Sequence, residues 1–140
     1  MKINSKQLKK AHLLMMKYQS KFKSKKHLQF VGGQPCCVCQ SQSMIQVHHL
    51  LRPWDGVRGV GLKANDKNVI PLCFSHHNEL HKRGNEESFF EEQGFSHYHG
   101  KGVARTLWYS SPANDSYQQE IDEQLLGWAD QVIKDDEDGR

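Results

Sequence analysis

Two stretches decide how we expect this chain to fold: residues 35–50, PCCVCQSQSMIQVHHL, and residues 68–85, NVIPLCFSHHNELHKRGN. Together they hold all four cysteines and most of the histidines. In the first stretch, the run over residues 44–47 predicts a strand that leads into a pair of histidines. In the second, two histidines four residues apart would lie on one face of a helix, one turn apart. The sequence therefore predicts a mixed α+β fold in which two segments far apart in the chain share metal ligands.

A split set of cysteine and histidine residues predicts the first metal site. Cys36-x-x-Cys39 supplies one half and Cys73-x-x-His76 the other. Two residues between ligands form a tight knuckle, and thiolate with imidazole donors favours tetrahedral zinc. Four protein ligands leave no open position, so we expect a structural Zn²⁺ that stabilises a small core. Cys37 falls outside this spacing and is interpreted as a spare thiol, and the alternative is that all these cysteines are buried without metal.

The remaining histidines of the two stretches predict a second, open metal site. His77 and His81 can bind one ion from a helix, and His48 can complete a set of three. Three protein ligands leave positions for water or a phosphate oxygen, as in catalytic metal sites. Neighbouring strand residues point to opposite faces, so His49 would be free to act as a general base. The alternative for His48 and His49 is a pair of ordinary surface histidines. The H-E-x-x-H protease pattern does not match, because Asn78 holds the glutamate position.

Composition limits the classes of protein to consider. At 140 residues there is room for one modest domain, and the mean hydropathy of −0.77 indicates a small core. We find no apolar run long enough to span a bilayer and no signal peptide, so we expect a cytoplasmic protein. Thiols stay reduced in the cytoplasm, which favours metal ligands over disulfides for the cysteines.

The net charge of +3 hides a strong asymmetry along the chain. No acidic residue precedes Asp55 and lysines crowd the first 26 residues, whereas the last 26 residues are strongly acidic. A basic arm favours a polyanionic partner, although a solvated helix face explains the charge equally well.

The flanking segments are expected to be mainly helical. Apolar residues at helical spacing predict a basic amphipathic helix within residues 1–27, with the stripe Leu8, Ala11, Met15, Tyr18 and Phe22. Residues 27–31 look like a short strand. Asn85 is expected to cap a short helix, and Pro112 to end another. A last helix with Ile121, Leu125, Trp128 and Val132 would precede a disordered acidic tail. The expected units are 1–27, a central domain over 28–110, and 111–140.

Taken together, His48-His49, Asn68 before Val69–Leu72, and His77 with His81 resemble the His-Asn-His motif of HNH (His-Me finger, ββα-metal) endonucleases. The added cysteine pairs resemble the zinc-supported HNH proteins of phages and prophages, related to a RecA-dependent recombination-enhancement nuclease. This resemblance is closest over residues 35–85 and covers roughly half to two-thirds of the chain. It implies a small ββα-metal core with structural zinc, flanked by the N-terminal basic helix and C-terminal helices.

The resemblance also implies roles for single residues. His49 would be the general base, while His48 and His77, with His81 as third ligand, would hold a divalent ion (Mg²⁺, Mn²⁺, Ni²⁺ or Zn²⁺). Asn68 would hydrogen-bond the loop backbone and orient His49, although an ordinary turn asparagine remains an alternative. From their place in the loop between the strands, three basic residues are candidates for phosphate contacts, with ordinary solvated loop charges as the alternative: Arg52, Arg58 and Lys63.

The function expected from these features is single-metal hydrolysis of DNA in phage or prophage recombination or processing. The partners would be DNA and, with it, a recombinase or a packaging protein. Two hypotheses from other classes stay open: a catalytically silent, zinc-supported DNA-binding accessory protein, and a colicin-like RNase.

Overall fold

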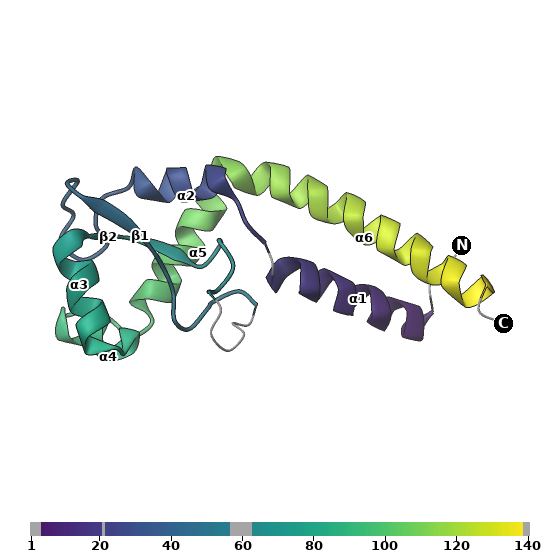
Figure 1. The fold of residues 1–140 in the computed structure, drawn as a ribbon, viewed down its shortest axis with the longest axis horizontal. Coiled ribbons are helices and arrows are strands. Elements are labelled where there is room, and N and C mark those ends of the chain that lie inside the picture. The colour runs from purple at the N-terminus through teal and green to yellow at the C-terminus, as the bar shows by residue number, and fades with distance from the viewer. Residues whose placement is uncertain (1–3, 21, 57–62, 139–140) are drawn as a thin grey trace.

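The computed structural model describes residues 4–20, 22–56 and 63–138 (Figure 1). The fold is α+β, as predicted. In chain order its elements are α1 (Ser5–Ser20), α2 (Lys25–Gly32), β1 (Ile45–His49), β2 (Val69–Cys73), α3 (Phe74–Arg83), α4 (Glu86–Glu92), α5 (His99–Ser110) and α6 (Pro112–Asp138).

The central unit is a strand pair followed at once by a helix. β1 and β2 are antiparallel, with Ile45 opposite Cys73 and His49 opposite Val69. β2 is buried along its whole length, and α3 begins directly after it. Gly84 ends α3 in the left-handed conformation (φ 73°), which glycine adopts without a Cβ penalty. The predicted strand before the histidine pair and the helix after the second strand are therefore both confirmed.

The main core lies between β2, α3, α4 and α5. Its buried members are Cys36, Cys37, Leu50, Ile70, Leu72, Cys73, Leu80, Phe89, Phe90 and Ala104. Asn85 caps α4 as predicted, because its side chain accepts a hydrogen bond from the Ser88 amide. α5 approaches α4 closely at Gly100, where an added Cβ would lie 2.8 Å from Phe90 Cε2. Helix packing at this point therefore requires a residue without a side chain.

The prediction of a strand over residues 27–31 was wrong, since these residues belong to α2. The Ser24 hydroxyl accepts the His27 amide at 3.1 Å and so caps the helix. His27 and Val31, four residues apart, are both fully buried on one helix face. The burial of these two side chains on one face therefore favours a helix over the predicted strand.

A second cluster joins the central unit to the terminal helices. Phe22, Trp108 and Tyr117 pack edge to face around the buried side chain of Lys67. Lys67 Nζ lies 2.6 Å from the Tyr117 hydroxyl and 3.9 Å from the centre of that ring. This cluster fixes the start of α6 to the loop that precedes β2.

α1 and α6 pack against each other and extend to one side of the central unit (Figure 1). Ser111 ends α5, and its hydroxyl accepts the Ala113 amide at the start of α6, so Pro112 separates two helices as predicted. Among the described side chains of α1, Gln7 and Ala11 are buried, whereas Leu8 is 45% exposed. Of the predicted stripe, Ala11 is therefore buried as expected and Leu8 is not.

The acidic tail is not a separate disordered segment, because α6 continues through Asp138. Residues 128–138 contain neither glycine nor proline, so nothing in their backbone chemistry interrupts the helix. The side chains of Met15, Tyr18 and Ile121, which the sequence placed on apolar stripes, lie outside the described residues. Within the described ranges, the helices lack the combination of length and apolarity that a bilayer crossing requires.

Candidate metal centres

Three cysteines and a histidine converge at the junction of β2 and α3. Cys36 and Cys39 come from the loop after α2, Cys73 ends β2, and His76 lies in the first turn of α3. Their ligand atoms all lie within 4.8 Å of one another, and Cys73 Sγ is 3.2 Å from His76 Nδ1. This Cys3His cluster could bind a metal ion such as zinc, since four soft and borderline donors around one point match tetrahedral coordination.

The environments of the adjacent thiols Cys36 and Cys37 differ. Burial would raise the pKa of Cys36, but hydrogen bonds with the backbone of Cys73, Cys39 and Val38 outweigh it and lower the pKa to about 7. Burial instead raises the pKa of Cys37 to about 12. The thiolate is the metal ligand, so Cys36 is suited to ligation and Cys37 remains a spare thiol.

A second group of donors lies on the other side of the same short helix. His48 from β1 and His77 and His81 from α3 bring one ring nitrogen each to a common point, all within 4.8 Å of one another. His77 Nε2 lies 3.2 Å from His48 Nδ1 and 2.9 Å from His81 Nε2. This three-histidine cluster supplies three imidazoles and no fourth protein ligand among the described residues, which leaves room for a water or a substrate oxygen.

His77 is held in the neutral form that binds metal. Burial, with His48 and His81 close by, lowers the pKa of His77 to about 4. Its Nδ1 is hydrogen-bonded to the side-chain oxygen of Gln46 on β1. The proton therefore sits on Nδ1, and Nε2 directs its lone pair into the three-histidine cluster.

His49 points away from this cluster, to the opposite face of β1, as strand alternation predicts. Its Nε2 lies 2.8 Å from Asp66 Oδ1, and the second carboxylate oxygen accepts the Ser24 amide at 2.8 Å. Burial would raise the pKa of Asp66, but the hydrogen bonds from His49 and the Ser24 amide lower it below its usual value. An ionised Asp66 accepts the Nε2 proton of His49 and so leaves Nδ1 as the basic nitrogen.

Asn68 is fully buried and ties the loop after β1 to the start of β2. Its side-chain oxygen accepts the amides of Trp54 and Asp55 at 2.7 and 3.1 Å. Its side-chain nitrogen donates to Asp55 O and to Asn65 Oδ1, each at 2.9 Å. Three of these four contacts reach Trp54 and Asp55 in the loop that follows His49, which is more than an ordinary turn asparagine does.

Two carboxylates of this region were not singled out from the sequence. Asp66 binds His49, and Glu86, the first residue of α4, lies with Oε2 2.7 Å from His48 Nε2. The only signals in the sequence were a polar run before Asn68 and an acidic residue directly after the helix cap Asn85. Neither signal says which histidine the carboxylate would reach.

The predicted phosphate contacts are placed only in part. Arg52 is 71% exposed, and its guanidinium lies 3.5 Å from Glu87. Lys63 is exposed, whereas Arg58 lies outside the described residues.

The fold and the two clusters define an α+β protein with a Cys3His cluster that could hold zinc and, beside it, a cluster of three histidines. Residues 2–105 match the family described as Protein of unknown function (DUF968), and the chain belongs to this family. It is similar to the Uncharacterized protein YdfU of Escherichia coli (strain K12), with 45% identity over 56 residues. That segment is 40% of this chain, and the chain covers 15% of the length of YdfU. No solved structure matches the chain.

Proposed function

We propose that this protein is an HNH-type endonuclease that uses one divalent metal ion to hydrolyse DNA phosphodiester bonds. The observation that carries the proposal is the pairing of the three-histidine cluster with a fourth histidine that turns to the other face of the strand. His48 and His49 are adjacent in β1, so the open metal site and the candidate base are fixed relative to each other by one strand.

The chemistry of a phosphodiester requires both parts of this arrangement. The substrate is already anionic, so an attacking hydroxide is repelled and charge accumulates as the 3′-oxygen departs. A divalent ion at the three-histidine cluster would supply the positive charge that offsets this build-up. His49 would take a proton from the attacking water at Nδ1, and Asp66 would stabilise the resulting imidazolium through Nε2. Asn68 would keep the loop after His49 in place.

Exposed positive charge favours a nucleic-acid substrate. Arg52 and Lys63 are exposed in the connection between β1 and β2, and α1 presents Lys6, Lys9 and Lys10 to solvent. Cations in these positions would bind phosphates without reading sequence, with an affinity that falls as salt rises. We propose DNA as the substrate. The biological setting would be phage or prophage recombination or DNA processing, with a recombinase or a packaging protein as partner.

The test is a plasmid-cleavage assay with zinc-loaded protein across Mg²⁺, Mn²⁺, Ni²⁺ and added Zn²⁺. We expect the wild type and His12→Ala, an exposed histidine of α1, to cleave, and His49→Ala to be inactive with unchanged zinc content and circular dichroism. Intact plasmid with all four ions would overturn the proposal. A mobility shift without cleavage would then assign a silent DNA-binding protein, and cleavage of transfer RNA alone would assign an RNase.

A further inference from the structure

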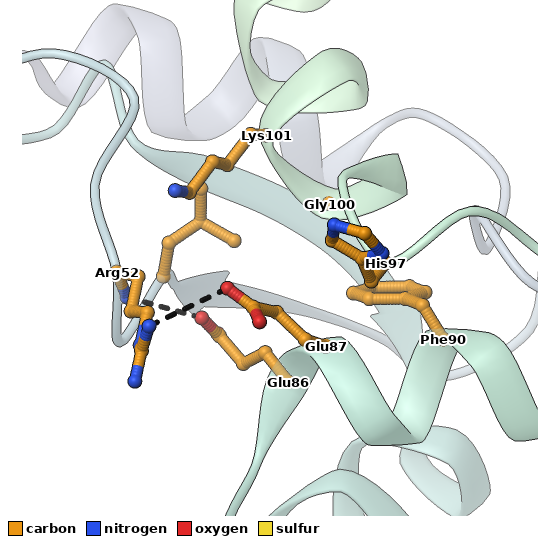
Figure 2. Close-up of a pocket in the computed structure, with 8 residues that line it drawn as sticks. Arg52, Glu86, Glu87, Phe90, His97, Gly100 and Lys101 are labelled. Atoms are coloured by element: carbon orange, nitrogen blue, oxygen red, sulfur yellow. Dashed lines mark hydrogen bonds and ion pairs between the residues drawn. The ribbon is translucent and has the colours of Figure 1, made fainter.

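Glu86 occupies a position between the three-histidine cluster and the loop after β1. Both Glu86 and His48 are buried, with 8% and 3% of their surface exposed. One carboxylate oxygen faces His48 Nε2 at 2.7 Å, and the other accepts the amides of Leu51 and Arg52 at 2.8 and 3.1 Å. Figure 2 shows Glu86 and Glu87 extending from the start of α4 toward Arg52.

This contact decides which nitrogen of His48 can bind a metal ion. An ionised carboxylate only accepts hydrogen bonds, so His48 must carry its proton on Nε2 to donate to Glu86. Nδ1 is then unprotonated, and it is Nδ1 that lies 3.2 Å from His77 Nε2 inside the cluster. A histidine that ligates a metal generally donates its other ring N–H to such an acceptor, which fixes the tautomer and the ring orientation.

The same carboxylate joins the cluster to a candidate substrate contact. The backbone of Arg52 is held by Glu86, while its exposed guanidinium is directed to the neighbouring carboxylate of Glu87. Glu86 therefore has two separable tasks: an oxygen that holds the loop amides, and an oxygen that sets His48.

We propose that Glu86 is a positioning residue that holds His48 in the tautomer able to bind a divalent ion, and that it links this ligand to the loop carrying Arg52. Its consequence for catalysis rests on the proposed nuclease function, whereas its consequence for metal binding does not.

The variant Glu86→Gln separates the two tasks. Its amide oxygen can still accept the Leu51 and Arg52 amides, but its NH2 group would then face His48 Nε2. Two donors cannot share that contact, so His48 would move its proton to Nδ1, where it blocks the lone pair that points into the cluster. Glu87→Gln is the matched control, because it changes the next residue of the same helix turn, and the Glu87 carboxylate faces the Arg52 guanidinium whereas His48 is paired with Glu86.

The experiment titrates zinc-loaded protein with Ni²⁺ by calorimetry at neutral pH, after metal analysis has shown that the Cys3His cluster is filled. We expect Glu86→Gln to bind Ni²⁺ about 10–100-fold more weakly than wild type, which is the usual cost of losing such a partner. Glu87→Gln should match the wild type. Equal affinity of the two variants would overturn the inference.

A second measurement keeps the inference testable if Glu86→Gln fails to fold. Long-range ¹⁵N–¹H NMR spectra of wild-type protein, before Ni²⁺ is added, report which nitrogen of His48 carries the proton. We expect Nε2, and a proton on Nδ1 would overturn the inference. The two proposals can fail separately: protein that binds Ni²⁺ through His48 yet leaves plasmid intact would refute the nuclease function alone.

Discussion

Replacing Asn68 by alanine should destabilise the loop that follows His49. In a fully buried position, the side chain makes four short hydrogen bonds, with the amides of Trp54 and Asp55, the carbonyl of Asp55 and the side chain of Asn65, and a longer one of 3.4 Å to the carbonyl of Asn65. At about 1 kcal/mol for each of the four short bonds, Asn68→Ala should lower the free energy of unfolding by about 4 kcal/mol. For a chain of this size, that corresponds to a loss of roughly 8–16 °C in melting temperature.

The assay is urea unfolding followed by tryptophan fluorescence, at a fixed concentration of free zinc because bound metal adds to the apparent stability. Asn78→Ala, an exposed asparagine in the middle of α3, is the matched control and should change the unfolding free energy by less than about 0.5 kcal/mol. If Asn68→Ala were as stable as this control, the assignment of Asn68 as the anchor of the loop would be refuted.

Three further outcomes are expected. Gly100→Ala should lose about 1–3 kcal/mol of stability in thermal melts, because its Cβ would meet the Phe90 ring, while Gly102→Ala, with nothing within 4 Å, should be neutral or stabilising. Burial lowers the pKa of His27 to about 4, so stability present above pH 6.5 should fall by about 3 kcal/mol as the pH drops to 4. A His27→Gln variant that kept the same pH slope in denaturant titrations would contradict this. Cys39→Ser should release zinc and lose helical circular dichroism, as should a strong chelator, and retention of the fold without zinc would show that the Cys3His cluster is not structural.

The central unit could be predicted because short-range spacing and elementary geometry determine it. His77 and His81 are one turn apart in any helix, and His48 and His49 must diverge in any strand. The structure places these side chains in the predicted directions. The spacing of the histidines therefore identified the candidate ligands without any knowledge of the tertiary fold.

The parts that sequence reasoning missed depend on packing between distant segments. α2 was taken for a strand because the burial of His27 and Val31 depends on distant segments, such as Trp108 of α5, which packs against His27. Asp66 and Glu86 reach histidines 17 and 38 residues away, and the path of the chain between them was not readable from composition. A carboxylate in a polar run has many possible partners, and the fold selects one.

His76 and His77 are adjacent in the chain, yet they serve the Cys3His cluster and the three-histidine cluster respectively. Each residue of an α-helix turns its side chain by about 100° from the one before it, so one register of α3 aims both rings correctly at once. A single residue inserted or deleted between Cys73 and His76 would rotate His76 away from the Cys3His cluster and His77 away from the three-histidine cluster. Length variation among relatives should therefore be absent from this turn, and engineered insertions or domain fusions belong at other points of the chain.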